Sequence, residues 1–399
     1  MTTTTMKMTT ATRRVGAFAF LTSFALLPAC GDLNTARVDM IAYEPDGSLV
    51  AFMPTGIHVL APSLDRESMT IAFDGLPVNT EQLGTGYNLS ADGRVAAVWF
   101  STPAGSTEKD SIVLFDMATG ATGQTFQLDD VVPSVANKLT KQRVFGVVLS
   151  PQADLCFVRA SLLVDEYGNP FTMFRDTVID VASGAVLWTT DTLYTDYEYP
   201  AFSADGTRLF GYVSIEAGIE ALDARTGANL YTRPLADTGI PPVLKDLAPT
   251  ADGKLVGVTQ PSLCGDVDSC ASSFATWSAA DLTPLGAQPL PPQTVPTDVV
   301  SVTGFGTPLA CSSSNNLCAY GLQDVSTTPT NNYLVSVTSS DGTPLRELGH
   351  LPVAVNMAFA PDGQVLAILA GEVKTDKIRL FNVNSGALVA SLSFDLNVP

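Results

Sequence analysis

Six cysteines are the side chains of this 399-residue chain best suited to covalent chemistry, and their spacing separates them into pairs and singles. Cys264 and Cys270 enclose the short segment CGDVDSC, and Cys311 and Cys318 lie on either side of a short polar turn. Each close pair predicts a disulfide, a bond that an exported protein can keep. Cys156 lies in the apolar run LCFVRA, so we expect a buried thiol there.

Metal chemistry has little support in the sequence. The chain has two histidines, His58 and His350, and neither stands at ligand spacing from a cysteine. Asp266 and Asp268 lie close together but lack the signature of a calcium loop. We therefore expect no metal and no other cofactor.

Two polar segments combine carboxylates with tyrosines, a mixture that can hold a sugar, a cation or a basic protein segment. The alternative is a solvated loop whose tyrosines pack on neighbouring strands. The candidate binding residues are Asp165, Glu166, Tyr167, Asp191, Tyr194, Asp196, Tyr197, Glu198 and Tyr199.

Signatures of the common catalytic sites are missing, because the chain contains no HExxH, GxSxG or Walker sequence. Aspartates recur at positions 46, 92, 205, 252 and 362, and they would form a ring of carboxylates if they converged. Each one stands directly before a glycine, which favours a structural role in a turn. The sequence thus favours binding over catalysis and leaves an enzymatic role open.

The elements that position these residues come from an internal repeat. A β-type run, an Asp-Gly turn and a second β-type run recur as YEPDGSLVAF (43–52), LSADGRVAAVWF (89–100), FSADGTRLFGYV (202–213), PTADGKLVGVT (249–259) and FAPDGQVLAILA (359–370). Two copies have drifted, with Ala153 and with Asn315-Asn316 at the turn. Asparagine tolerates the positive φ that glycine adopts there, whereas alanine resists it, so we expect an irregular turn at Ala153.

A second pattern follows each copy of the first and consists of an apolar strand, Asp-x-x-Thr/Ser-Gly and another strand. Its copies are LFDMATGATGQTF (114–126), VIDVASGAVLWTT (178–190), ALDARTGANLYTR (221–233) and LFNVNSGALVASL (380–392), with looser versions at 277–290 and 335–348. Each unit therefore holds four strands, which we label A to D. Seven such units fill residues 37–394.

This four-strand repeat resembles the seven-bladed β-propellers of the WD40 and YVTN-repeat kind, although the Gly-His and Trp-Asp signatures of true WD40 repeats are missing. The resemblance implies an all-β fold with a single propeller of about seven blades at 37–394 and a short tail at 395–399. DVASGAVLW (180–188) is also similar to the docking repeat of PQQ-type propellers, which usually have eight blades. Six blades, or two β-sandwiches, are further alternatives. The ring would close by packing of the last blade on the first, without a swapped strand.

Residues 1–29 have the features of a targeting segment, with a basic start and an apolar stretch of about 15 residues that is too short to span a bilayer. LPAC (27–30) resembles the lipobox of bacterial lipoproteins, in which cleavage leaves a lipidated cysteine at the new N-terminus. The resemblance implies a signal peptide at 1–29, lipidation of Cys30, a tether at 30–36 and attachment to the cell envelope. Gly31 favours the outer membrane over the inner one. An ordinary secretory peptide with a chance cysteine is the alternative.

The chain is strongly acidic, with a net charge of −19 from 40 acidic and 21 basic residues. Nucleic-acid phosphates and anionic lipid headgroups would repel it, so we expect no nucleic-acid partner and membrane attachment through the lipid. In propellers of this kind the A–B and C–D turns share one face. These turns are short in this chain, so we call that face the plain face. Long segments such as 128–144, 163–176, 190–200 and 261–273 belong to the opposite, elaborated face.

The tether between Cys30 and the first strand reaches about 20 Å, so the elaborated face would lie close to the membrane. We therefore expect an envelope-anchored lipoprotein that serves as a binding or scaffold propeller for a protein or glycan partner. The alternative is a propeller enzyme of the lactonase or quinoprotein dehydrogenase kind.

Overall fold

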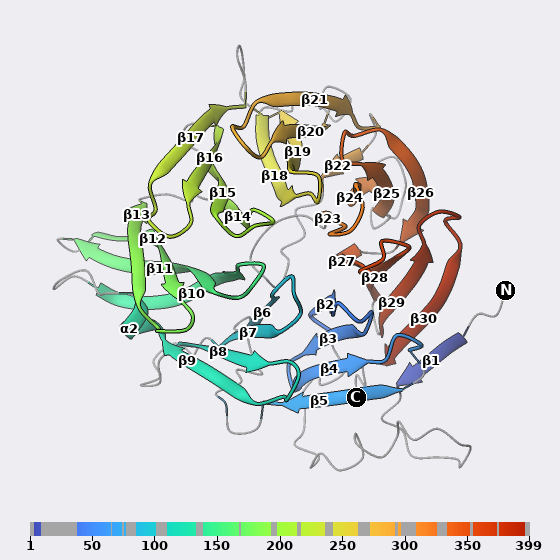
Figure 1. Cartoon of the computed structure of the whole chain (residues 1–399), viewed down its shortest axis with the longest axis horizontal. Coiled ribbons are helices and arrows are strands. Elements are labelled where there is room, and N and C mark those ends of the chain that lie inside the picture. Colours follow the sequence, from blue (N-terminus) through green and yellow to red (C-terminus); the bar gives the residue numbers. More distant parts are fainter. Residues whose placement is uncertain are drawn as a thin grey trace.

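The computed structural model of the chain is a ring of seven β-sheets, arranged as blades around a central axis (Figure 1). The first strand of each blade, strand A, lies nearest the axis, and strand D lies at the rim (Figure 1). The predicted all-β propeller with seven four-stranded blades is therefore confirmed. The structure describes residues 4–8, 38–64, 66–73, 76, 85–100, 110–132, 139–166, 169–192, 198–213, 217–235, 242–261, 272–291, 294–296, 309–324, 333–351, 354–372 and 375–395.

Each blade is an antiparallel sheet whose strands pair in the order A, B, C and D. Blades 1 to 4 consist of β2 (Met40–Tyr43), β3 (Leu49–Met53), β4 (Gly56–Leu60) and β5 (Glu67–Ala72); β6 (Thr85–Leu89), β7 (Val95–Phe100), β8 (Ser111–Asp116) and β9 (Thr122–Gln127); β10 (Leu139–Leu149), β11 (Leu155–Glu166), β12 (Asn169–Asp180) and β13 (Val186–Thr192); and β14 (Glu198–Phe202), β15 (Arg208–Val213), β16 (Gly218–Asp223) and β17 (Asn229–Pro234).

Blades 5 to 7 follow the same order, except that two short strands of blade 6 both pair with its strand B and together take the place of strand A. These blades consist of β18 (Pro242–Pro249), β19 (Lys254–Pro261), β20 (Ser273–Ser278) and β21 (Pro284–Pro289); β22 (Thr294–Pro296), β23 (Leu309–Cys311), β24 (Leu317–Asp324), β25 (Tyr333–Ser339) and β26 (Pro344–Leu351); and β27 (Ala354–Phe359), β28 (Val365–Glu372), β29 (Thr375–Asn382) and β30 (Leu388–Asp395). A single helical turn, α2 (Leu128–Val131), follows blade 2. Within the described segments, no helix has the length and apolar character needed to cross a membrane.

Apolar side chains on both faces of each sheet hold the blades together. In β7, whose sequence is VAAVWF, Ala96 and Val98 pack toward blade 1, whereas Ala97 and Trp99 pack toward blade 3. A cluster of buried side chains fills each space between neighbouring blades in this way. Because both faces are buried, the inner strands are continuous apolar runs rather than alternating ones.

The ring closes between blade 7 and blade 1 without a swapped strand. Ile41 and Ala51 of blade 1 pack in one cluster with Ala367 and Leu369 of blade 7. The backbone N of Ile41 also donates a 3.1 Å hydrogen bond to Oδ1 of Asn356 on β27. Side-chain contacts therefore join the two ends of the ring.

One strand lies outside the four-strand pattern. β1 (Thr4–Met8) pairs in parallel with β30 at the rim of blade 7 (Figure 1). These five residues fall within the predicted targeting segment. Cleavage before Cys30 would remove β1 and leave every blade with its own four strands.

The A–B turns of blades 1 to 5 and 7 share one hydrogen-bond pattern, including the turn at Ala153. In blade 2 the backbone N of Gly93 donates to the backbone O of Ser90 at 2.9 Å. In blade 3 the backbone N of Ala153 makes the same 2.9 Å bond to Ser150, so the prediction of an irregular turn is wrong. Ala153 accepts a φ of +56°, a conformation that costs a residue with a Cβ about 1–2 kcal/mol.

The C–D turns carry close contacts between blades. Oδ1 of Asp180 accepts hydrogen bonds from the backbone N and the hydroxyl of Ser183, as the Asp-x-x-Thr/Ser-Gly pattern predicts. In the next blade, a Cβ on Gly227 would lie 2.8 Å from Cδ2 of Trp188. The Trp188 indole donates a 2.9 Å hydrogen bond from Nε1 to the backbone O of Ala224. The turn glycine of blade 4 thus lets a ring from blade 3 pack against it.

Candidate functional site

The aspartates of the A–B turns stabilise their own turns. In blade 2, Oδ1 of Asp92 accepts hydrogen bonds from the Ser90 hydroxyl at 2.7 Å and from the backbone N of Arg94 at 3.1 Å. Asp205 is bound in the same way by the Ser203 hydroxyl, which holds the pKa of Asp205 below its usual range. These hydrogen bonds favour the ionised carboxylate. They support the interpretation of the recurring aspartates as turn residues.

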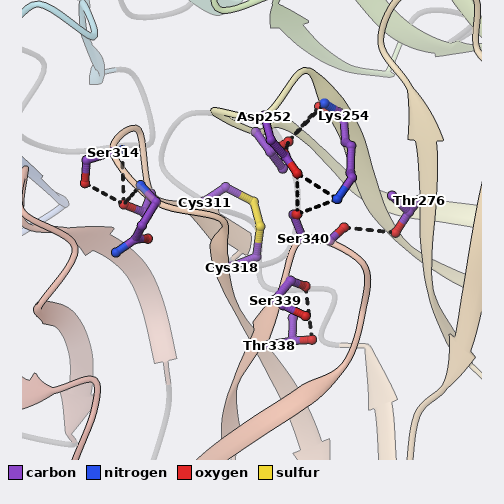
Figure 2. The surroundings of a disulfide bond; sticks show 12 residues. Asp252, Lys254, Thr276, Cys311, Ser314, Cys318, Thr338, Ser339 and Ser340 are labelled. Atoms are coloured by element: carbon purple, nitrogen blue, oxygen red, sulfur yellow. Dashed lines mark hydrogen bonds and ion pairs between the residues drawn. A yellow bond between two sulfur atoms is a disulfide. The ribbon is translucent and has the colours of Figure 1, made fainter.

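Asp252, in the A–B turn of blade 5, also links this blade to the next one (Figure 2). Its Oδ2 lies 2.7 Å from Nζ of Lys254 and accepts a 2.9 Å hydrogen bond from the hydroxyl of Ser340, in the C–D turn of blade 6. Oγ1 of Thr276 donates to the backbone O of Ser340 at 3.2 Å. Ser340 therefore joins blades 5 and 6 at the plain face.

A disulfide lies beside this link (Figure 2). Cys311 and Cys318 are bonded across the A–B hairpin of blade 6, with their Cα atoms 4.1 Å apart. The bond encloses the Asn315-Asn316 turn, which lacks the Asp-Gly pair of the other copies. Cys156 is buried in β11, and burial raises the pKa of its thiol to about 12, so it is a poor nucleophile.

Blade 3 differs from the other blades in the length of its strands. β11 and β12 have 12 residues each, compared with eight in the longest strands of blade 7. They pair from Leu155 opposite Asp180 to Glu166 opposite Asn169. Figure 1 shows this hairpin projecting beyond the rim of the ring.

Two ion pairs brace this hairpin. Arg159 on β11 and Asp176 on β12 are both buried, with Nε 2.8 Å from Oδ1 and Nη2 2.7 Å from Oδ2. Arg175 pairs with Asp191 on β13, with Nη2 2.7 Å from Oδ2 and a second contact through Nε. Bidentate pairs of this kind fix the relative geometry of the strands that carry them. The guanidinium of Arg159 also lies 5.6 Å from the centre of the Phe174 ring.

The candidate binding residues that the structure describes do not meet in one place. Asp165 and Glu166 end β11 at the tip of the hairpin. Asp191 lies opposite Arg175, about 20 Å along β12 from that tip. Tyr199 lies in β14 with a φ of +55° and packs against the cluster between blades 4 and 5, which fits the alternative of a packed tyrosine.

Several predicted site residues lie outside the described residues, so what was predicted of them stays a prediction. The residues outside are Cys30, Cys264, Cys270, Tyr167, Tyr194, Asp196 and Tyr197. Glu198, in contrast, is described and belongs to β14. Lipidation and the second disulfide are therefore predictions. Among the residues that are described, no three His, Cys, Asp or Glu side chains gather as a metal site requires.

The sequence did not predict a groove on the plain face, between blades 1 and 2, with a volume of about 630 Å³. Its charged lining residues are Glu44, Asp46, Arg66 and Arg94, and Met69 and Met117 add apolar surface. Glu44 is half-buried, and this burial, together with the charge of Asp46, raises the pKa of Glu44 to about 7.

The repeat itself contains a signal for this groove. Three residues before the turn glycine, blades 2, 4 and 5 have Ser90, Ser203 and Thr250, each of which donates its hydroxyl to the turn aspartate. Blade 1 has Glu44 at this position. An ionised glutamate cannot donate, so two carboxylates are brought together where blades 2, 4 and 5 have a hydroxyl and a carboxylate.

The fold is similar to β-propellers of known structure. Similar chains include one of hydrazine synthase from Kuenenia stuttgartiensis, with a TM-score of 0.53 and 11% identity over 94% of this chain and 99% of that one. The β-propeller domain of Cps50 (Swd1) from Myceliophteria thermophila has a TM-score of 0.50 and 14% identity over 84% and 93%. A prolyl endopeptidase structure has a TM-score of 0.52 and 12% identity over 92% and 51%. At these identities the similarity shows the fold alone. No protein-family model and no curated protein matches the chain.

Proposed function

We propose that this chain is an exported lipoprotein, anchored at Cys30, whose propeller serves as a binding or scaffold module for a protein or glycan partner in the cell envelope. Residues 1–29 and the LPAC sequence support export and anchoring. The observation that carries the binding role is the long, braced hairpin of β11 and β12.

The hairpin extends beyond what packing between the blades requires, since the other blades close with shorter strands. The Arg159–Asp176 and Arg175–Asp191 pairs hold it in one shape. A rigid arm loses little conformational entropy when it binds, so more of its contact energy becomes affinity. Its tip has two acidic residues, Asp165 and Glu166, which suit a basic protein segment or the hydroxyl groups of a glycan.

The flank of the same sheet adds apolar surface. Phe145 on β10 is 41% exposed and Leu163 on β11 is 39% exposed. The Phe145 ring meets the Phe174 ring edge-on, with the ring centres 5.3 Å apart. Aromatic side chains held in place in this way are typical anchors of binding surfaces.

The position of the first strand supports an orientation toward the membrane. β2 begins at Met40 on the elaborated face, since strand A runs from that face to its A–B turn on the plain face. The tether, residues 31–36, reaches about 20 Å. Lipid at Cys30 would therefore keep the elaborated face, with the hairpin, within about one tether length of the bilayer.

The anchor is tested by Cys30→Ser in cells that export the protein. We expect the variant to lose incorporation of labelled fatty acid and to move from the membrane fraction to the soluble fraction. Cys156→Ala, which changes a buried thiol in blade 3, should keep both properties. A Cys30→Ser protein that still carries labelled lipid would show that the lipobox interpretation is wrong.

The partner is tested by affinity capture from solubilised envelopes, analysed for both proteins and glycans. The hairpin variant carries Asp165→Lys and Glu166→Lys, and the matched control carries Asp129→Lys and Asp130→Lys in α2. The wild type and the control should recover the same partner, and the hairpin variant should lose it. Equal recovery by all three, or no partner together with turnover of a substrate, would overturn the proposal.

A further inference from the structure

The groove between blades 1 and 2 carries charges of both signs, distributed along its length. Glu44 and Asp46 lie in the A–B turn of blade 1, close to the axis, and Arg94 lies in the A–B turn of blade 2. Arg66 directly precedes β5, the rim strand of blade 1. Neighbouring strands are about 4.8 Å apart, so strands A and D of one blade are separated by about 14 Å. The two carboxylates and Arg66 therefore lie toward opposite ends of the groove.

The middle of the groove is apolar. Val59 and Met117 are almost fully buried, and Met69 packs against the same cluster between blades 1 and 2. Methionine side chains adapt to ligands of different shapes. This surface can cover an apolar side chain.

The inner end of the groove is suited to a cation. Glu44 replaces the hydroxyl residue that blades 2, 4 and 5 use to bind the turn aspartate, so its carboxylate lies near the carboxylate of Asp46. Oδ1 of Asp46 accepts a 2.8 Å hydrogen bond from the backbone N of Ser48. Partial burial and the charge of Asp46 raise the pKa of Glu44 to about 7 and so disfavour its ionised form relative to an ordinary glutamate. An ammonium group placed between the two carboxylates would relieve that repulsion.

We propose that this groove binds a short peptide with free ends, about four residues long, whose terminal ammonium lies between Glu44 and Asp46 and whose terminal carboxylate lies at Arg66. An extended peptide spans about 3.3 Å per residue, so about four residues cover the distance between strands A and D. The groove volume of about 630 Å³ is within the range of pockets for small ligands. This site is separate from the hairpin and does not depend on the proposed envelope partner.

Isothermal titration of the full chain in mild detergent with trileucine and tetra-alanine tests the proposal. We expect binding of trileucine at least as tight as binding of tetra-alanine, because the middle of the groove is apolar. Acetylation of the amine or amidation of the carboxylate should each weaken binding about tenfold, which is the effect of losing a hydrogen bond to a charged group.

Two variants test separately how the groove binds the two ends of the peptide. Glu44→Ser introduces the residue that blades 2 and 4 have at this position and should fold normally. This variant should bind about tenfold more weakly and become insensitive to acetylation. Arg66→Ala should become insensitive to amidation. Arg233→Ala, an arginine on the rim strand of blade 4, is the control and should bind as the wild type does. Binding of neither peptide by the wild type, or equal binding of the acetylated peptide, would overturn the proposal.

Discussion

Oδ1 of Asn356, on strand A of blade 7, accepts a 3.1 Å hydrogen bond from the backbone N of Ile41, on strand A of blade 1. Asn88 of blade 2 binds the backbone N of Leu149 in blade 3 in the same way, at 2.9 Å. Strand A is the inner edge of its sheet, so half of its N–H groups have no partner in their own blade. Side-chain amides from the preceding blade satisfy two of these groups at the centre of the ring.

In blade 5 the residue with this role on strand A is Asp246, so a carboxylate replaces the side-chain amide. Its side chain accepts hydrogen bonds from the backbone N of Leu309 in blade 6 and, at 2.8 Å, from the backbone N of Leu247. Burial raises the pKa of Asp246 well above its usual range despite these two bonds. The folded protein therefore holds a proton on Asp246 at pH values where the unfolded chain has released it.

Asp246→Asn should therefore stabilise the protein at pH 7 to 8. The wild type loses stability as the pH rises from the unfolded-state pKa, about 3.9, through the raised folded-state pKa, whereas the asparagine does not titrate. The gain should shrink to nothing as the pH falls toward 4. Thermal unfolding of both proteins across this range measures the effect, and a gain that grows toward acid pH would contradict it.

The buried pair in the blade 3 hairpin should be costly to break. Asp176→Ala leaves the guanidinium of Arg159 buried without its main partner, and we expect a loss of about 3–5 kcal/mol in the free energy of unfolding. The double variant Arg159→Met and Asp176→Leu removes both charges and should recover most of that loss. Denaturant unfolding of the three proteins tests this. A double variant less stable than Asp176→Ala would show that the pair itself is net stabilising.

The turn at Ala153 offers a stabilising substitution. Ala153→Gly removes the Cβ from a residue with a φ of +56°, and we expect a gain of about 1 kcal/mol in the free energy of unfolding. Gly206→Ala is the reverse change at the equivalent position of blade 4, where φ is +73°, and should destabilise by a similar amount. The midpoints of chemical unfolding give both values. A loss of stability in Ala153→Gly would mean that the buried methyl group matters more than the backbone conformation.

The Cys311–Cys318 bond encloses a short loop, so its effect on the unfolded chain is modest. The double variant Cys311→Ser and Cys318→Ser should lose about 2 kcal/mol of stability. The variant is preferable to chemical reduction, which would also act on a bond between Cys264 and Cys270 if one forms. A melting temperature equal to that of the wild type would show that the Asn315-Asn316 turn needs no bond.

The blades could be predicted because each one repeats its own turn chemistry. Asp92 is an example from the A–B turns and Asp180 is an example from the C–D turns. A turn aspartate contacts residues close to it in the sequence, so the spacing reveals these contacts directly. The disulfide between Cys311 and Cys318 could be predicted for the same reason, since both residues flank a single hairpin turn.

Features that depend on contacts between strands or blades could not be predicted. The Arg159–Asp176 pair requires the register of β11 on β12, and the groove requires the packing of blade 1 on blade 2. Glu44 was visible as a departure from the repeat, but the raised pKa of its own carboxyl group follows only from its partial burial beside Asp46. Ala153 shows the opposite case, since the surrounding turn imposes a conformation that its own preference opposes.

Because the ring closes without a swapped strand, the junction between blades 7 and 1 differs mechanically from the other junctions. Once cleavage before Cys30 has removed β1 and its pairing with β30, the covalent chain crosses every junction between blades except the one between blades 7 and 1. The described contacts at that junction are packed side chains and the bond between Ile41 and Asn356. A pulling force applied between the tether and the C-terminal end would load this junction first. The blades would then peel away one after another from the two ends, so the extension at each step would correspond to one blade.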